Sequence, residues 1–177
     1  MIEIRTATAT ATDAAVLAEL AAATFGLACP PHTTTEAIAA FLRDVLAEGN
    51  FDAYLADPER LILVAEEGGV MLGYTMLVFA EPADADVRAA IGIRPTVELS
   101  KCYLRAETHG RGVAAPLMAA TLEAARARGA AGSWLGVNQE NARAIRFYQK
   151  NGFATVGEKR FLVGGRYEDD FVLERAL

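Results

Sequence analysis

The chain has 177 residues, of which 53% are hydrophobic and 23% charged, and its formal net charge is -6 at pH 7. This length suits one domain with one core, and the composition argues against a disordered chain. An acidic balance argues against a protein that grips DNA or RNA through phosphates, so we expect no nucleic-acid partner. We therefore treat residues 1–177 as a single domain.

The amino-terminal third of the sequence predicts one short strand followed by helices. Residues 2–8 begin with alternating apolar and charged side chains, as in a half-buried strand. Helical spacing predicts a first helix over 12–25, with Thr12 as its N-cap and Gly26 as its end. A second helix is predicted over 36–49, and residues 50–58 are predicted as a short helix or a loop.

The rest of the chain alternates predicted strands and helices. Apolar, partly β-branched runs on both sides of a Glu-Gly-Gly turn predict an antiparallel hairpin. The predicted elements are strands at 61–65, 70–79, 97–104 and 134–137, helices at 112–128 and 141–150, a loop or small insertion at 81–95, and a closing hairpin of 153–163 with 167–173. This order implies a mixed sheet with helices on both faces.

The sequence also argues against a membrane protein and a metalloprotein. Asp13 and Glu19 interrupt the apolar amino-terminal stretch, so we expect no membrane span and a cytoplasmic protein. Cys29 and Cys102 are the two cysteines and lie far apart, which argues against a disulfide scaffold. Because their spacings to the two histidines do not match a zinc site, we expect no metal.

The most informative stretch is residues 109–115, His-Gly-Arg-Gly-Val-Ala-Ala, between a predicted strand and a predicted helix. Its glycines let the backbone approach a ligand, and free N–H groups of a helix's first turn attract phosphate. An ordinary glycine turn is the alternative. The stretch also fits G-x-G-x-x-A, but the acidic residue expected about twenty positions later in a dinucleotide fold is missing. A Walker A loop is excluded because no Lys-Ser/Thr follows the last glycine.

A second group of residues surrounds the next predicted helix. Asn138 precedes this helix, and Asn141, Ile145 and Tyr148 follow at i, i+4 and i+7, so these three share one face. Two interpretations stay open from the residues alone. The helix binds a ligand, or Asn141 is simply an N-cap and Tyr148 a core aromatic residue.

Together the two groups resemble the GCN5-related N-acetyltransferases, over residues 98–153. Residues 109–114 are similar to the pyrophosphate motif of that family, Gln/Arg-x-x-Gly-x-Gly/Ala, and Asn141-x-x-Ala144-x-x-Phe147-Tyr148 is similar to its second cofactor motif. His109 departs from the usual Gln or Arg. Because backbone amides chiefly hold the phosphates in this motif, we expect binding to survive, and a solvent-facing His109 stays the alternative.

The resemblance implies an α/β (α+β) fold with a mixed, mostly antiparallel central sheet of about seven strands and helices on both faces. It implies acetyl-CoA (coenzyme A) as the cofactor. The residues implied to contact this cofactor are Cys102, Tyr103, Leu104, His109, Gly110, Arg111, Gly112, Val113, Ala114, Asn138, Asn141, Ala144, Phe147 and Tyr148.

The resemblance also implies two catalytic residues. An amine is a cation at neutral pH and must lose a proton before it attacks a thioester, so a base is needed. Some family members carry a catalytic carboxylate at the position of Glu98, and Tyr148 would protonate the departing thiolate. Alternatively, Glu98 only attracts the ammonium or forms an ion pair, and Tyr148 only packs.

Strand alternation adds geometry to this prediction. A period of two places Glu98, Ser100 and Cys102 on one face. At about 3.3 Å per residue, Glu98 and Cys102 lie about 13 Å apart, so we expect a relay water. The backbone near residues 102–104 is implied to pair with the pantetheine arm and to stabilise the oxyanion. No histidine or aspartate is arranged to activate Cys102, so we predict a buried small hydrophobe rather than a nucleophile.

The predicted acceptor is a primary amine of a small molecule, with Glu98 and Asp170 as candidate substrate contacts. A further resemblance to the bacterial spermine/spermidine acetyltransferase branch makes a polyamine one candidate. It covers the amino-terminal helix pair, the 61–79 hairpin, residues 134–137 and the closing segment 164–177. Asp169 and Asp170 would then bind cations, or they are a solvated charge cluster. A protein amino group, a drug-like amine and a non-catalytic acyl-CoA-sensing module stay open, as does a homodimer formed through sheet edges or closing strands.

Overall fold

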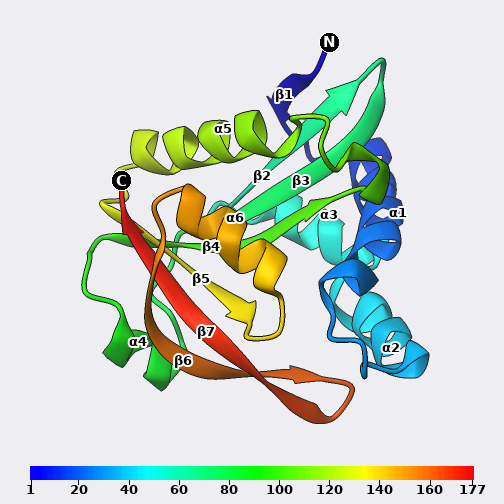
Figure 1. Cartoon of the computed structure of the whole chain (residues 1–177). Coiled ribbons are helices and arrows are strands. Elements are labelled where there is room, and N and C mark those ends of the chain that lie inside the picture. The colour runs from blue at the N-terminus through cyan, green and yellow to red at the C-terminus, as the bar shows by residue number, and fades with distance from the viewer.

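The computed structural model describes the backbone of residues 1–177 and the side chains of all of them except Ala11. This described chain forms a seven-stranded sheet in the order β1-β2-β3-β4-β5-β7-β6 (Figure 1). Neighbouring strands are antiparallel except β4 and β5, which are parallel. The strands are β1 (Glu3–Thr6), β2 (Arg60–Glu67), β3 (Val70–Val78), β4 (Thr96–Leu104), β5 (Gly132–Asn138), β6 (Ala154–Val163) and β7 (Arg166–Ala176). The predicted mixed, mostly antiparallel sheet is confirmed.

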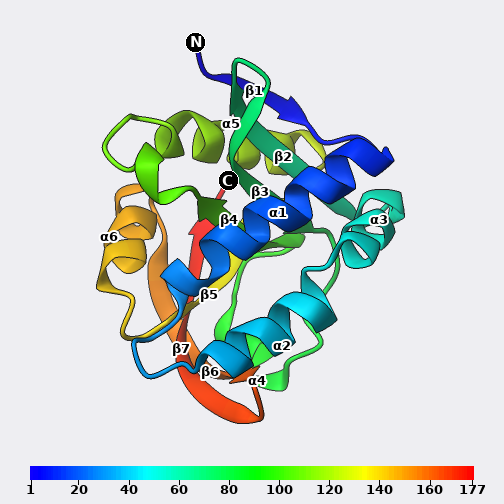
Figure 2. The ribbon, with the colours of Figure 1, turned by 90° about the vertical axis from the view of Figure 1, so that its right-hand side faces the viewer.

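Helices cover both faces of the sheet, as Figures 1 and 2 show from two directions. One face carries α5 (Ala114–Ala127) and α6 (Ala142–Lys150). The other face carries α1 (Ala11–Ala28), α2 (Thr35–Val45), α3 (Glu48–Ala56) and α4 (Ala85–Ala90). A short 3-10 turn over Ala106–Thr108 joins β4 to the segment before α5. Among these described helices, none is both long and apolar enough to cross a bilayer.

Two main cores follow from this layering. The core under α1 and α3 is centred on fully buried side chains such as Leu17, Phe51 and Tyr74. The core under α5 and α6 includes Met118 and Leu135, both at most 1% exposed. Because burial of apolar area is the main stabilising contribution in folding, these two layers hold the sheet between them and fix where its strand ends lie.

The first helix is longer than predicted at both ends. Its N-cap is Thr10 rather than Thr12, with the Thr10 hydroxyl accepting a hydrogen bond from the Asp13 N–H. The helix continues through Gly26 to Ala28. A glycine inside a helix costs only about 0.5–1 kcal/mol relative to alanine, so the packing of the helix against the sheet outweighs it. Pro30 ends the extension, because the residue before a proline avoids the helical region.

Two other predicted segments differ in detail. The second helix, α2, ends at Val45 instead of residue 49, and the segment predicted as a short helix or a loop is the helix α3. α3 begins earlier than predicted, at Glu48, because the Asn50 side chain accepts a hydrogen bond from the Ala47 N–H and starts the helix there. The predicted loop at 81–95 contains the short helix α4, which is capped by the Asp84 carboxylate at the N–H groups of Asp86 and Val87.

The strand pair that matters most for function is the parallel one. β4 and β5 pair only over Thr96–Glu98 and Gly132–Trp134. Beyond that point β4 continues beside β3, and β5 continues beside β7 as far as Asn138. The two halves of the sheet therefore separate toward the carboxyl ends of these strands, and a gap opens between them.

Candidate active site

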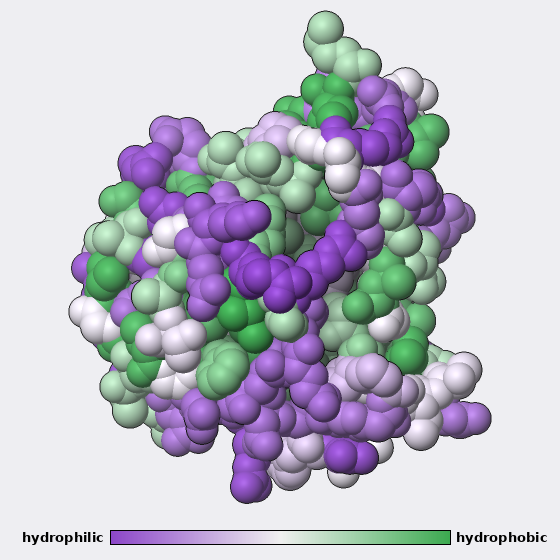
Figure 3. Space-filling view, in the orientation of Figure 1, coloured by the Kyte–Doolittle hydropathy of each residue, from purple (hydrophilic) through white to green (hydrophobic). Residues whose placement is uncertain are grey.

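Two cavities meet over the gap between β4 and β5. The first, of about 470 Å³, lies between the carboxyl end of β4 and helices α5 and α6. The second, of about 180 Å³, lies between the gap, the end of α1 and the β6–β7 hairpin. Both are lined by Ala28, Cys102, Tyr103, Asn141, Ala144 and Tyr148, so their junction lies among these residues. Figure 3 shows this face hollowed near its centre, where apolar atoms reach the surface beside a band of hydrophilic ones.

The larger cavity ends at the glycine-rich turn before α5. Within the described chain, the N–H groups of His109 and Arg111 donate to carbonyl oxygens of the preceding turn, and those of Gly110, Gly112 and Val113 have no such partner. Gly110 and Gly112 have φ values of 82° and 76°, the left-handed region that favours glycine. This alternation leaves three amides and the helix amino terminus free to bind an anion.

Most of the predicted cofactor contacts line this larger cavity. They are Cys102, Tyr103, Leu104, His109, Gly110, Gly112, Val113, Ala114, Asn141, Ala144, Phe147 and Tyr148. Two predicted contacts lie elsewhere. The Arg111 guanidinium pairs with Glu67 at 2.7 Å, away from the cavity. Asn138 lines the smaller cavity instead, and its side-chain oxygen accepts a hydrogen bond from the Glu140 N–H.

Arg143 is a lining residue that the sequence reasoning missed. It is exposed on α6, one turn before Phe147, and both residues line the larger cavity. Burial lowers the pKa of His109, and the nearby charge of Arg143 lowers it further. His109 and Arg143 therefore flank the same end of the cavity, and Arg143 places a fixed positive charge near the free amides. Arg143 precedes Phe147 by four residues, so the sequence already placed the two side chains on the same face of the predicted helix.

The structure shows the N-cap at the start of α6 and is compatible with ligand binding by the same helix. Asn141 is the N-cap, because its side-chain oxygen accepts a hydrogen bond from the Ala144 N–H at 3.1 Å. Tyr148 packs against the core under α5 and α6 and also lines both cavities. Burial raises the pKa of Tyr148 well above its usual value, so the hydroxyl holds its proton at neutral pH.

Cys102 is a partly buried thiol that forms a hydrogen bond with Tyr148. Burial raises the pKa of Cys102 to about 12, and a hydrogen bond from Tyr148 lowers it by less. A thiol held in its neutral form is a poor nucleophile. The geometry therefore favours a packing role for Cys102.

The structure corrects the predicted face of Glu98. In the pairing of β3 with β4, Leu99 and Lys101 oppose consecutive residues of β3, so Ser100 is an extra residue, or β-bulge. A bulge reverses the strand alternation beyond it. Glu98 and Lys101 consequently lie on one face and Cys102 on the other, and the prediction that Glu98, Ser100 and Cys102 share a face is wrong.

The smaller cavity collects charged side chains of both signs. Glu98 and Lys101 come from β4, Lys159 from β6, and Glu168 and Asp170 from β7. Burial raises the pKa of Glu98, and the charges of Lys101, Lys159 and Arg60 oppose that rise. Burial lowers the pKa of Lys101 to about 8.

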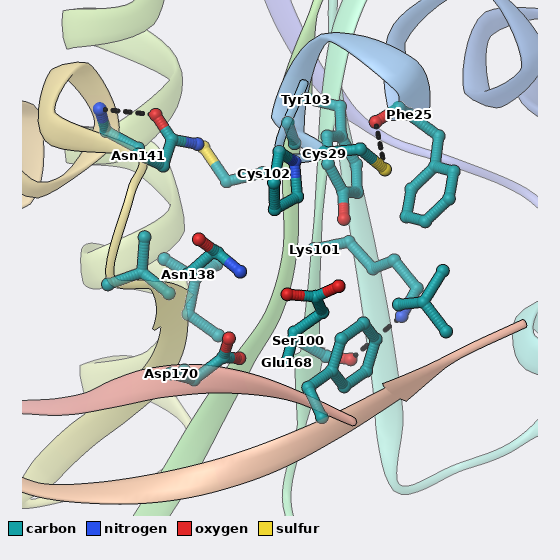
Figure 4. Close-up of a pocket in the computed structure, with 18 of the residues that line it drawn as sticks. Phe25, Cys29, Ser100, Lys101, Cys102, Tyr103, Asn138, Asn141, Glu168 and Asp170 are labelled. Atoms are coloured by element: carbon teal, nitrogen blue, oxygen red, sulfur yellow. Dashed lines mark hydrogen bonds between the residues drawn. The ribbon is translucent and has the colours of Figure 1, made fainter. Parts of the chain in front are cut away.

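Asp170 is the most deeply buried of these charged residues, at 6% exposure. Its Oδ1 has no hydrogen-bond partner among the described residues. Burial raises the pKa of Asp170 to about 6, mainly against the lowering effect of Lys159. Figure 4 shows Asn138 and Asp170 on one side of the cavity and Tyr103 and Lys101 on the other. Asp169, the other predicted cation contact, is exposed and does not line the cavity.

Aromatic rings form one wall of the same cavity. Phe25 and Phe41 stack with ring centroids 4.4 Å apart, and Phe161 meets Phe41 edge to face at 5.7 Å. Tyr103 meets Phe25 at 6.2 Å. Offset and edge-to-face pairs of this kind give a rigid apolar surface.

The loop after α1 meets the edge of this cavity through a hydrogen bond between His32 and Glu168. His32 Nε2 lies 2.8 Å from Glu168 Oε1, and His32 Nδ1 lies 3.7 Å from Glu140 Oε2. These three side chains each offer a ligand atom, all within 4.8 Å of one another, so they are the described group that could hold a metal ion. Within this group, Glu168 and His32 are already joined by a direct hydrogen bond.

The comparison with known proteins gives the class of this protein. The sequence matches the acetyltransferase (GNAT) family over residues 23–153. The chain therefore belongs to this family of N-acetyltransferases, which use acetyl-CoA as acyl donor and act on amines.

Two relatives of known sequence support this assignment. An uncharacterized N-acetyltransferase of Mycobacterium tuberculosis is 45% identical over 166 residues, which cover 94% of this chain and 99% of the relative. A further N-acetyltransferase, from Lactobacillus delbrueckii subsp. lactis, is 29% identical over 92% of this chain and 89% of its own length.

Solved structures match the fold over its whole length. The PaiA N-acetyltransferase of Thermoplasma acidophilum, determined in complex with coenzyme A, has a TM-score of 0.79 at 20% identity and covers 100% of this chain and 99% of its own. The ribosomal-protein-S18-alanine N-acetyltransferase of Escherichia coli has a TM-score of 0.69 at 17% identity, with 99% and 94% covered. At these identities the likeness shows the fold alone.

Proposed function

We propose that this enzyme transfers an acetyl group from acetyl-CoA directly to the primary amine of a small molecule. The observation that carries the proposal is the junction of the two cavities at Tyr148, over the gap between β4 and β5. A donor that enters from the larger cavity and an acceptor in the smaller one meet there without a covalent acyl-enzyme.

The residues of the larger cavity fit coenzyme A. The free N–H groups of Gly110, Gly112 and Val113 suit a diphosphate, and Arg143 adds a positive charge beside them. The apolar remainder of the lining, with Leu104 and Phe147, suits an uncharged arm. Acetyl-CoA would supply an acyl group activated as a thioester.

Tyr148 is proposed as the proton donor to the departing thiolate. Tyr148 lines both cavities, and its raised pKa keeps the hydroxyl proton available at neutral pH. A positioned donor of this kind contributes typically about 10²–10⁴-fold to the rate.

Glu98 is proposed as the final acceptor of the amine proton. It faces the smaller cavity, hereafter the acceptor cavity, beside Lys101. Its raised pKa makes it a stronger base than an ordinary glutamate. It stands where β4 and β5 still pair, opposite Trp134, and so at the closed end of the gap. The proton therefore reaches it through water.

The size of the acceptor cavity favours a small amine. About 180 Å³ is less than the roughly 300–1,000 Å³ of pockets that hold drug-sized ligands. This supports a small metabolite over a drug-like amine. A polyamine, the candidate from the branch resemblance, would have to place several ammonium groups beside Lys101 and Lys159, which repel them.

A thiol-release assay over a panel of amines tests the proposal. We expect release of coenzyme A that depends on the amine, with mass spectrometry identifying an N-acetylated small molecule. Binding of acetyl-CoA without thiol release for any amine would instead favour a sensing module. Acetylation confined to added peptides would favour a protein amino group.

A further inference from the structure

The acceptor cavity contains four charged side chains that form no direct ion pair in the described chain, although Lys159 and Asp170 lie opposite each other in the β6–β7 register. Glu98, Asp170, Lys101 and Lys159 all line it, and none forms an ion pair in the described chain. Lys101 Nζ lies 3.3 Å from the Ser100 hydroxyl, and Lys159 Nζ lies 5.3 Å from the centre of the Phe161 ring. Glu168, by contrast, is already paired with His32 and Arg166.

Charged groups in a buried site are unfavourable unless partners compensate them. These four groups are two acids and two bases, so their charges cancel within the cavity although no pair is in contact. A ligand that carried only positive groups would satisfy the acids and repel the lysines. A ligand with one group of each sign satisfies both.

Asp170 provides an independent sign of where the positive group binds. Asp170 is only 6% exposed and lines the cavity, and its Oδ1 has no hydrogen-bond partner in the described chain. Such an atom normally has a hydrogen bond to protein, water or ligand. Asp170 pairs in register with Asn138, four residues beyond Trp134 along β5. At about 3.3 Å per residue, this places it about 13 Å from the closed end of the gap, toward the cavity junction.

Lys101 provides the complementary site on the opposite side of the cavity. Figure 4 shows it across from Asp170, with Tyr103 beside it. Its position after the β-bulge turns it into the acceptor cavity rather than toward α5. The aromatic wall of Phe25, Phe41 and Phe161 stands over the same space and suits an apolar body.

We propose that the acceptor is a zwitterionic amine of the amino-acid type, whose ammonium binds Asp170, whose carboxylate binds Lys101 with help from Lys159, and whose apolar side chain packs on the aromatic wall. This inference rests on the proposed function and narrows its substrate class. The ammonium first gives up one proton to Glu98 through water, and the neutral amine nitrogen then forms an amide bond to the acetyl carbon as the thioester C–S bond breaks. The thiolate takes its proton from Tyr148, and the second proton of the nitrogen restores the Tyr148 hydroxyl.

Matched pairs of amines that differ only in the carboxylate test this inference on the whole enzyme. Suitable pairs are phenylalanine with 2-phenylethylamine, tyrosine with tyramine, and leucine with isopentylamine, and spermidine serves as a polyamine. We expect kcat/KM for the better amino acids to exceed that of their decarboxylated partners by about 10- to 100-fold, the effect of one charge-assisted hydrogen bond.

Two variants locate the effect. Lys101→Met should bring the ratio of kcat/KM within each pair close to one, and Lys159→Met should reduce it by a smaller factor. Lys150→Met removes the same charge from an exposed site on α6 and should leave the ratio as in the wild type. In calorimetric titrations, the affinity of the coenzyme A complex for the amino acid should fall most in Lys101→Met, less in Lys159→Met and not at all in Lys150→Met. Melting temperatures report whether each variant folds.

The outcomes separate this inference from the proposed function. Preference for spermidine or for the decarboxylated amines, with efficient thiol release, overturns the zwitterionic acceptor and keeps the acetyltransferase. A ratio that Lys101→Met leaves unchanged also overturns it. If no amine in the panel produces thiol release, the proposed function itself is overturned.

Discussion

The two cavities are built in different ways. The larger cavity, the proposed cofactor cavity, uses mainly backbone N–H groups and apolar side chains, and most of its lining comes from two stretches, 102–115 and 141–148. The smaller cavity, the proposed acceptor cavity, uses charged and aromatic side chains from α1, α2, β4, α6, β6 and β7. A cavity made from short continuous stretches keeps its chemistry when distant residues change. A cavity assembled from many separate elements changes its specificity with single side chains.

The largest expected effect is at Tyr148, where the two cavities meet. Tyr148→Phe should lower kcat by about 10²-fold or more, because the thiolate loses its proton donor. Stopped-flow thiol release measures this directly. Tyr167→Phe, on an exposed ring of β7, is the matched control. If turnover of the Tyr148 variant equals that of the wild type, Tyr148 only packs.

Glu98→Gln should affect the acceptor side alone. We expect kcat to fall by about 10²-fold, because a neutral amide takes no proton. Burial raises the pKa of Glu98, so the acid limb of the wild-type pH profile should lie above the usual value of about 4.3 and vanish in the variant. Glu3→Gln, on an exposed residue, is the control. An acid limb that persists in the Glu98 variant would assign the proton to another group.

Gly112→Ala should affect the cofactor side alone. At φ 76° an alanine is strained by about 1–2 kcal/mol. The turn relieves this strain by moving its N–H groups out of the binding geometry, so the Kd of acetyl-CoA should rise by about 5- to 30-fold. Gly129→Ala creates similar strain at the other end of α5, where φ is 88° and space is equally open. Isothermal titration compares the two. Equal Kd values in both variants would mean that the turn does not hold the phosphates.

Asp13→Ala should change stability and leave kinetics almost unchanged, because it lies outside both cavities. Asp13 is buried and accepts hydrogen bonds from Arg5 and from the backbone and hydroxyl of Thr8. Removing it should lower the melting temperature by about 2–12 °C at pH 7.

The pH dependence of that loss is a sharper test. The Arg5 hydrogen bonds lower the pKa of Asp13 to about 2, below the ordinary value of 3.8. A depressed pKa stabilises the fold fully above the unfolded value and loses that effect as pH falls toward 2. The difference in melting temperature between wild type and Asp13→Ala should therefore shrink between about pH 4 and 2. A difference that stayed constant there would contradict the ion pair.

Local patterns predicted most of the fold and most of the residues that line the larger cavity. Alternating and helical spacing located the strands and helices, and the glycine turn at 109–114 is a short motif whose function depends on its own backbone. Gly26 was misread as a helix end because tertiary packing outweighs a small local preference. Arg143 was missed although its place one turn before Phe147 was visible.

The acceptor cavity was much harder to predict, for a physical reason. The bulge at Ser100 depends on how β4 pairs with β3, and it decides that Lys101 rather than Cys102 shares the face of Glu98. Lys159 and Asp170 reach the same space only because β6 and β7 pair in one register. Such convergence is a property of the assembled sheet, and no segment of sequence carries it alone.

The most direct test of the account is a crystal structure of this enzyme with bound acetyl-CoA. We predict the diphosphate within hydrogen-bond distance of the N–H groups of Gly110, Gly112 and Val113, and the thioester beside Tyr148 at the junction of the two cavities. A diphosphate bound elsewhere, with water alone at these amides, would contradict it.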